Sequence, residues 1–180
     1  GMYPAPAGLP FVSGNEGAGE VIAVGSGVTD LKIGDRVGYV VAMGGYAEER
    51  LLAADRAVKL PDNISYEQAA AMMLKGMTAQ YLLRRTHAVK NGDTILVHAA
   101  AGGVGMILCQ WGKALGAKMI GVASGPEKVK LGLANGYSYM IDRANEKIVD
   151  RVKEITGGAM LPVVYDSVGM TTFDKSLLSL

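Results

Sequence analysis

The second half of the chain alternates between short apolar runs and longer segments in which apolar residues recur at helical spacing. The apolar runs predict buried strands at Thr94–Ala100, Lys118–Ala123, Tyr139–Asp142 and Leu161–Asp166. The segments between them predict helices that begin after Gly103, extend over Glu127–Ala134 and Asn145–Thr156, and start again at Thr171. This alternation predicts an α/β fold built on a doubly wound parallel sheet with right-handed crossovers.

The first half of the chain shows short apolar segments broken by glycine. These predict strands at Glu20–Gly25, at Arg36–Val41 and within Tyr46–Arg56. Many short strands separated by turns are typical of a small β-barrel or sandwich. Ser65, followed by Glu67 and Gln68, then predicts the start of a long helix that runs to Thr86 and is interrupted near Gly76. We therefore expect two domains, residues 1–74 and 75–180.

A glycine-rich turn, Ala101–Gly105, lies between a predicted strand and the helix that follows it. Unpaired N–H groups at such a helix start, together with the positive end of the helix dipole, suit a pyrophosphate. Gly102, Gly103 and Val104 are the candidate contacts. The alternative is that the glycines serve only tight packing of the helix on the strand.

Several motifs around this turn carry a family resemblance. They are Gly92-Asp93, Leu96, Ala100–Gly105, Gln110 and Lys113, with Gly34–Val37, Leu74–Thr78 and Val164–Gly169 elsewhere in the chain. The pattern resembles quinone oxidoreductases related to zeta-crystallin, a branch of the medium-chain dehydrogenase/reductase superfamily, over essentially the whole chain. The resemblance implies a Rossmann nucleotide-binding domain and part of a chaperonin-10-like catalytic domain. Relatives have further strands at both ends, so the chain is expected to be truncated at both.

Composition narrows the classes of partner. The 180 residues carry a net charge of +1, which gives no electrostatic footprint for nucleic acid or an anionic membrane. There is no apolar run long enough for a membrane span and no signal peptide pattern, so the simplest location is the cytoplasm. The single cysteine, Cys109, excludes an internal disulfide and a multi-cysteine zinc site.

The resemblance also bears on metal binding. Asn15 stands where zinc-dependent members of the superfamily have a ligand histidine, and a neutral amide is a poor zinc ligand. Glu16 is interpreted as a structural carboxylate. His87 and His98 lack metal-ligand spacing, and His98 is interpreted as a core histidine with its hydrogen bonds satisfied. We expect no metal site.

The strand ending at Ala123 is where nucleotide-binding folds distinguish the two nicotinamide cofactors. An acid there would accept from the ribose 2′-hydroxyl of NAD and repel a 2′-phosphate. This strand continues into Ser124 and Gly125 without an acid before Glu127, and Lys128 matches the position where relatives hold the NADPH phosphate. Arg143, at a site usually tyrosine or histidine in the family, is a second candidate cation; alternatively it points away into solvent. NADPH is therefore favoured over NADH.

Four further residues are candidates for the site, three of them from the resemblance and Ser167 from its place after the last predicted strand. Thr78 and Tyr81 match positions near the nicotinamide ribose and a cofactor phosphate, the alternative being a helix hydroxyl and a packed tyrosine. Ser167 turns off the last strand at the cofactor edge. Tyr3 matches a loop that faces the substrate cleft, or else is an exposed loop tyrosine. Tyr3 and Thr78 are the candidates for orienting the substrate.

The predicted activity is NADPH-dependent, zinc-independent hydride transfer to quinones, with the cofactor supplying the hydride and the protein supplying orientation. One alternative is reduction of other enones, such as 2-alkenals or enoyl thioesters. Another is a non-catalytic NADPH- or RNA-binding protein of the crystallin type. The resemblance also implies a homodimer.

Overall fold

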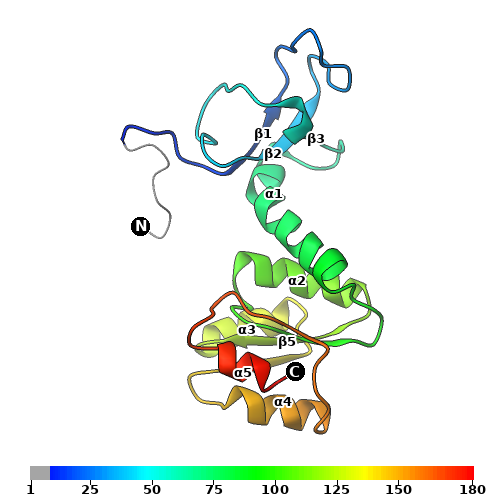
Figure 1. The fold of residues 1–180 in the computed structure, drawn as a ribbon, viewed down its shortest axis with the longest axis vertical. Helices are drawn as coiled ribbons and strands as arrows, with labels where there is room; N and C mark the ends of the chain where they lie inside the picture. Colours follow the sequence, from blue (N-terminus) through cyan, green and yellow to red (C-terminus); the bar gives the residue numbers. More distant parts are fainter. Residues whose placement is uncertain (1–8) are drawn as a thin grey trace. The chain divides into compact units, whose positions relative to one another are not determined.

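The structure is a computed structural model and describes residues 9–180 (Figure 1). The chain divides into two compact units, Gly1–Lys75 and Gly76–Leu180, and the boundary falls inside one helix, α1 (Tyr66–Tyr81). No described helix is long and apolar enough to cross a lipid bilayer.

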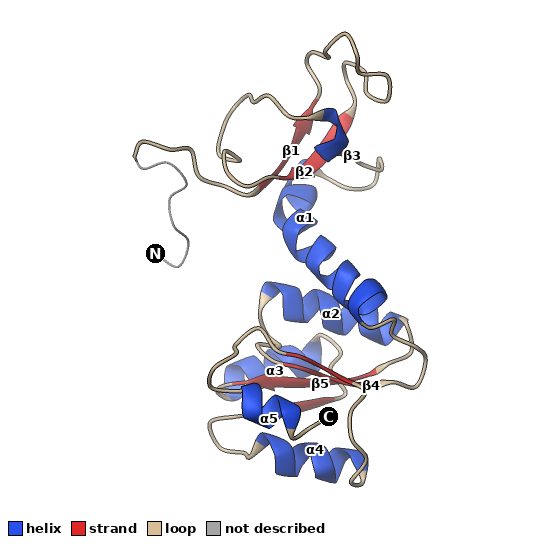
Figure 2. Ribbon diagram, in the orientation of Figure 1, coloured by secondary structure: helices blue, strands red, loops and turns tan. Residues whose placement is uncertain are grey.

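The first unit contains a three-stranded antiparallel sheet of order β1-β2-β3 (Figure 2). Its strands are β1 (Glu16–Glu20), β2 (Arg36–Val40) and β3 (Ala57–Lys59), and a short 3₁₀ helix, η1 (Ala54–Arg56), leads into β3. The prediction of a strand at Arg36–Val41 is confirmed to within one residue. The predictions at Glu20–Gly25 and within Tyr46–Arg56 are wrong.

The first of these errors has a packing cause. β1 contains Gly17 opposite Tyr39, and a Cβ on Gly17 would lie 2.4 Å from the Tyr39 hydroxyl. Gly17 therefore lies under an aromatic ring of the neighbouring strand, and with Gly19 two positions later β1 has no apolar alternation to detect. The apolar residues Ile22 and Val24, which suggested a strand, are exposed and outside the sheet.

Helix α1 begins with a reciprocal pair of capping hydrogen bonds. The Gln68 amide donates to Ser65 Oγ (3.1 Å), and the Ser65 amide donates to Gln68 Oε1 (2.9 Å). The helix continues through Gly76, so the predicted interruption there is wrong. It changes only at η2 (Leu82–Thr86), a π-helical turn. Burial of Ala79 and Leu83 in the core stabilises this region against the roughly 1 kcal/mol that a helical glycine costs.

The second unit is built on a four-stranded parallel sheet of order β6-β5-β4-β7. The strands are β4 (Thr94–Val97), β5 (Lys118–Ala123), β6 (Tyr139–Asp142) and β7 (Val163–Tyr165). The helices after them are α2 (Gly103–Ala114), α3 (Pro126–Ala134), α4 (Ile148–Thr156) and α5 (Phe173–Leu177). The predicted bounds of β5 and β6 are confirmed, whereas β4, β7 and α4 are shorter than expected.

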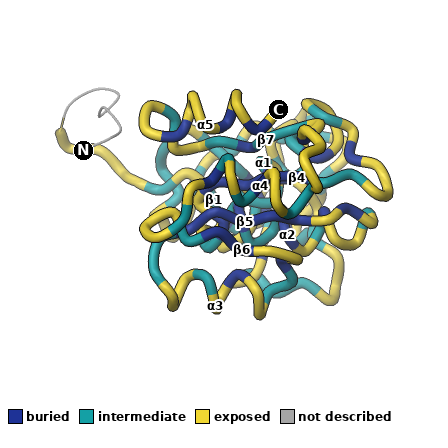
Figure 3. The backbone as a smooth tube through the Cα atoms, turned by 90° about the horizontal axis from the view of Figure 1, so that it is seen from below, coloured by how far each residue is buried: buried dark blue, intermediate teal, exposed yellow. Residues whose placement is uncertain are grey.

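The sheet of the second unit is covered on both faces. Ile95 and Val97 belong to a core cluster with residues of α1, η2 and α2, while Leu96 belongs to a second cluster with Ile148 and Val152 of α4. Because successive strand residues point to opposite faces, these two clusters lie on opposite sides of the sheet. Figure 3 shows buried stretches along the strands and exposed residues along α3. The predicted doubly wound α/β fold is confirmed.

Candidate functional site

The carboxyl ends of all four parallel strands border one cavity. Its volume is about 240 Å³, and its lining residues are His98, Ala99, Ala101, Gly102, Val122, Ala123, Ser124, Lys128, Arg143 and Val168. Ligands of open α/β sheets bind at this edge. The volume is below the roughly 300–1,000 Å³ of a site for a whole ligand, so it suits one part of a larger molecule.

The turn after β4 brings the start of helix α2 to the cavity. Ala99 has a φ of +50°, which ends the strand at Val97 although the three residues after His98 are apolar. The Gly102 amide donates to the Ala99 carbonyl (2.8 Å), and Gly102 is the N-cap of α2. No side chain caps this end, and its first turn carries no acid. The first amides of the helix are thus suited to an anion.

The three residues proposed from this turn have different environments. Gly102 lines the cavity, and Gly103 is the first residue of α2. The Val104 side chain is half-buried against the core, so Val104 can contribute only its backbone amide at this helix end. The neighbouring Gly105 has the closest contact, because a Cβ there would lie 2.5 Å from the Ala100 carbonyl oxygen.

The turn after β5 contributes a hydroxyl and a cation. Ser124 lines the cavity, and Gly125, with a φ of +89°, is the N-cap of α3. Lys128 lies on the first turn of α3, is exposed, and has no hydrogen bond or ion pair with any residue in 9–180. An unpaired ammonium group at a cavity edge is available to an anionic ligand.

Arg143 reaches the same cavity from the end of β6. Its Nε donates to Ser124 Oγ (2.6 Å), so the arginine turns toward the β5 end and not away from it. The structure therefore brings together Ser124, Lys128 and Arg143, which are separate in sequence. No acidic side chain is among the residues that line this cavity.

The loop after β7 closes the cavity at Val168, beside the exposed Ser167. Asp166 holds the loop in place. Its Oδ1 accepts from the amides of Val168 (2.9 Å) and Gly169 (3.0 Å) and from Thr172 Oγ1 (2.9 Å), while Ser176 Oγ donates to Oδ2 (2.6 Å). Burial opposes ionisation of Asp166, but these four hydrogen bonds outweigh it and hold its pKa well below the ordinary value.

His98 lies in the cavity wall, which the sequence did not indicate. It is buried, and its Nε2 is 3.1 Å from Ser176 Oγ. Because Ser176 donates its proton to Asp166, His98 must donate through Nε2–H, and Nδ1 is a buried acceptor with no partner among the described residues. Burial lowers the pKa of His98; Asp166 opposes this, and Arg143 and Lys175 add to it. The prediction of a buried histidine is confirmed, but only one ring nitrogen is satisfied.

The remaining predicted residues do not line this cavity. Thr78 and Tyr81 lie on α1, half-buried and exposed respectively, and Gly125 and Ser167 are next in sequence to lining residues. Tyr3 lies outside the described residues. The placement of Thr78 and Tyr81 near a cofactor stays a prediction.

The first unit holds Asn15 and Glu16, two of the residues considered for zinc. Asn15 Nδ2 donates to the carbonyls of Val41 (3.4 Å) and Ala42. Glu16 accepts the Leu74 amide (2.7 Å) and pairs with Lys75 (4.0 Å), so its interpretation as a structural carboxylate is confirmed. Residues 9–180 contain no cluster of three or more histidine, cysteine or acidic side chains able to hold a metal ion.

The second unit is a doubly wound sheet, and one cavity brings together its strand ends, an uncapped helix start and two cations. These features define a dinucleotide-binding domain of the Rossmann class. Family models agree: the zinc-binding dehydrogenase model matches residues 103–180, and the alcohol dehydrogenase GroES-like domain matches residues 1–62. The chain belongs to the medium-chain dehydrogenase/reductase superfamily. The family resemblance seen in the sequence is thereby confirmed.

Individual relatives are similar over nearly the whole chain. A quinone oxidoreductase of Pseudomonas aeruginosa is 56% identical over 178 residues, which are 98% of this chain and 54% of the relative. A 2-haloacrylate reductase of a Burkholderia species is 45% identical over 171 residues, 93% of this chain and 51% of the relative. The crystal structure of Escherichia coli quinone oxidoreductase complexed with NADPH has a TM-score of 0.93 and 50% identity, over 99% of this chain and 55% of that chain. The chain spans about half the length of the curated relatives it matches.

Proposed function

We propose that the protein is an NADPH-dependent, zinc-independent oxidoreductase that transfers a hydride to quinones. The observation that carries the proposal is the group of Ser124, Lys128 and Arg143 at one cavity whose lining contains no acid. Such a group suits a 2′-phosphate and has no carboxylate to accept from a 2′-hydroxyl. Relatives named quinone oxidoreductase, one of them solved with NADPH, support it.

The residues present fit this cofactor. The free amides of Gly103 and Val104 at the start of α2 would hold the pyrophosphate beside Gly102, which lines the cavity, and the cation group would hold the 2′-phosphate. Gly125 and Ser167 would shape the turns beside it, and Tyr81 would contact a further phosphate. When bound, NADPH supplies the hydride that reduces the acceptor.

The protein's own part is to orient the two reactants and to exclude water from between them. Thr78 and Tyr3 are proposed to orient the quinone. Residues 1–74 are proposed to be part of the chaperonin-10-like catalytic domain and residues 75–180 part of the Rossmann domain. The resemblance alone supports two further proposals, a homodimer and a cytoplasmic location; sedimentation analysis tests the first and microscopy of a tagged protein the second.

A binding titration tests the cofactor. NADPH and NADH are each titrated into the protein, and the dissociation constants are read from nicotinamide fluorescence. Lys128→Ala and Arg143→Ala should each weaken NADPH binding about tenfold, the value of one charge-assisted hydrogen bond, and leave NADH unchanged. Lys130→Ala is the matched control, because Lys130 is exposed on the same helix and does not line the cavity. Equal binding of both cofactors by the unaltered protein would refute the assignment.

Similarity to the 2-haloacrylate reductase favours one second candidate, the reduction of other electron-poor alkenes. Both activities use the same cofactor site, so only the acceptor distinguishes them. NADPH oxidation is measured with a panel of quinones, 2-alkenals and haloacrylates at equal concentrations. Turnover of alkenes without turnover of any quinone would replace the first proposal by the second.

A further inference from the structure

Asp142 is an acid at the carboxyl end of β6 that does not line the cavity although its neighbour Arg143 does. Its carboxylate instead accepts hydrogen bonds from nearby groups. The amides of Gly125 (2.9 Å) and Ala144 (3.1 Å) both donate to Oδ1, and Asn145 Nδ2 donates to Oδ2 (2.9 Å). One carboxylate oxygen thus joins the turn after β5 to the turn after β6.

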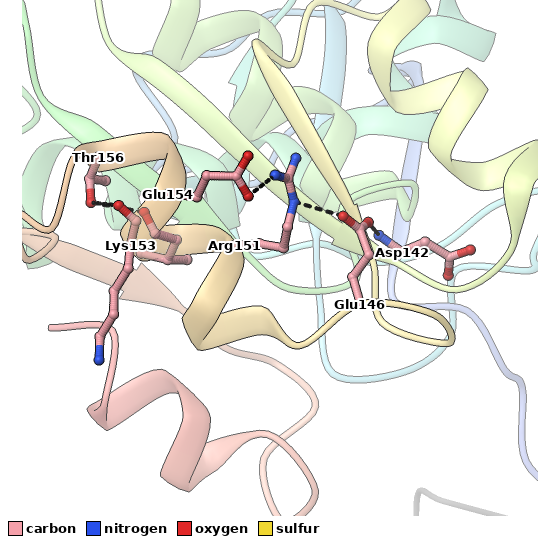
Figure 4. A network of polar contacts seen from close by, with 7 residues as sticks. Asp142, Glu146, Arg151, Lys153, Glu154 and Thr156 are labelled. Carbon is pink, nitrogen blue, oxygen red and sulfur yellow. Dashed lines mark hydrogen bonds and ion pairs between the residues drawn. The ribbon is translucent and has the colours of Figure 1, made fainter.

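The backbone of Asp142 is held from the α4 side. The Asp142 amide donates to Glu146 Oε2 (2.7 Å), and Glu146 Oε1 pairs with Arg151 Nε (2.7 Å). Arg151 pairs in turn with Glu154, so the network continues along α4 (Figure 4). Two elements, α3 through its N-cap and α4 through this network, therefore set the position of Asp142.

The residues that Asp142 joins are next in sequence to the cation group. Ser124 precedes Gly125, and Arg143 lies between Asp142 and Ala144. The Arg143 amide also donates to the Ala123 carbonyl (2.9 Å), and Arg143 Nε donates to Ser124 Oγ (2.6 Å). Without the Asp142 bridge, these two hydrogen bonds alone would hold the Ser124 and Arg143 side chains in place at their turns.

The carboxylate is also kept from acting on a phosphate directly. Hydrogen bonds from Gly125 and Ala144, followed by that from Asn145, hold the pKa of Asp142 below its ordinary value, so the group is anionic at neutral pH. Its oxygens are occupied by backbone and amide donors and it contributes nothing to the cavity wall. A carboxylate at this sheet edge would repel a bound phosphate unless, as here, it lies outside the cavity wall and accepts hydrogen bonds from other groups.

We propose that Asp142 is a positioning residue for the selection of NADPH over NADH. By bridging Gly125 and Ala144 it fixes Ser124 and Arg143 in the contact that receives the 2′-phosphate. The inference rests on the proposed function, because it assigns a role in the same phosphate subsite.

The test compares cofactor binding across a short series of variants. Asp142→Ala, which removes the acceptors of three hydrogen bonds, should raise the dissociation constant for NADPH about tenfold or more and change that for NADH less than about twofold. Asp142→Asn keeps an oxygen for the two backbone amides and should stay within about threefold of the unaltered protein. Asp150→Ala, an exposed acid on α4 that has no partner among residues 9–180, is the charge-matched control and should change neither constant.

A second readout separates the phosphate subsite from the rest of the cofactor. Calorimetry with 2′,5′-ADP and 5′-AMP should show the Asp142→Ala loss only for the ligand that carries a 2′-phosphate. If Asp142→Ala does not fold, as judged by circular dichroism, Glu146→Ala takes its place. That change removes the acceptor of the Asp142 amide, and it should weaken NADPH alone about threefold.

Each outcome has a distinct meaning. If the unaltered protein shows no preference for NADPH, the proposed function fails and the inference fails with it. If the unaltered protein prefers NADPH but Asp142→Ala (or its replacement) keeps that preference, or weakens both cofactors equally, the positioning role is refuted while the proposed function stands. Selective loss with Asp142→Ala and recovery with Asp142→Asn establish the role.

Discussion

Replacing Gly105 by alanine tests the packing of helix α2 against the turn after β4. Gly105 is buried in the first turn of α2, and a Cβ on it would lie 2.5 Å from the Ala100 carbonyl oxygen and 2.8 Å from the Ala100 carbonyl carbon. The carbonyl would have to retreat by about 0.5 Å to reach even the 3.0 Å limit of real Cβ contacts.

Ala100 has little freedom to retreat. It is fully buried, and its amide donates to the Val122 carbonyl of β5 (3.0 Å). Overpacking of this kind costs about 1–3 kcal/mol, which exceeds the 0.5–1 kcal/mol that alanine ordinarily gains over glycine in a helix. The net cost is therefore up to about 2.5 kcal/mol. At roughly 2–4 °C per kcal/mol for a chain of this size, Gly105→Ala should lower the melting temperature by up to about 10 °C.

Thermal unfolding followed by circular dichroism measures this, with two other glycines as controls. A Cβ on Gly112, in the same helix, would meet the Met119 thioether at 2.5 Å, and a flexible side chain yields more readily than backbone. Gly27→Ala meets nothing within 4 Å and should change stability by less than about 0.5 kcal/mol. A melting temperature for Gly105→Ala equal to or above that of Gly112→Ala would refute the close-packing argument.

Three further predictions concern single side chains. Ser65→Ala removes a helix cap and should cost about 1 kcal/mol in urea unfolding, whereas Ser65→Asp, which caps equally well, should cost much less. Burial raises the pKa of Cys109 to about 11, so at pH 7 the native protein should react with a disulfide reagent only as it unfolds, and rapid labelling would contradict this. Burial lowers the pKa of His98, so below about pH 6.5 the unfolded chain binds a proton that the native protein does not. The free energy of unfolding should therefore fall as the pH drops below about 6.5, and His98→Gln should lack this part of the pH dependence.

The parallel sheet was predictable because its strands are short, apolar and regularly separated by helices. β5 and β6 match the prediction residue for residue. The predicted strand is three residues longer than β4 because burial continues beyond the end of the extended backbone. Ala100 is fully buried although the chain has already turned at Ala99. The sequence pattern does not predict β1 because Gly17 packs under Tyr39, a contact between two strands that the pattern along one strand does not reveal.

The lining of the cavity was predictable in part, because the parallel sheet was. Gly102, Ser124 and Lys128 follow predicted strands, and strand ends meet at one edge of a parallel sheet. The hydrogen bond of His98 was not predictable, because its partner Ser176 comes from α5, far along the chain. Asp142 was recognisable as an acid at a strand end, but its hydrogen bonds to Gly125 and Ala144 depend on how two turns meet.

The order of strands in the second unit sets when the site can assemble during synthesis. β4 lies between β5, which follows it by one helix, and β7, which is completed only at Tyr165. At about 5–20 residues per second, the growing chain carries β4 for several seconds with one edge unpaired. Val168 completes the lining of the cavity, so we expect the proposed NADPH site to be complete only after this residue has been made. A nascent chain stalled before β7 should expose the apolar edge of β4 to chaperones and bind no NADPH.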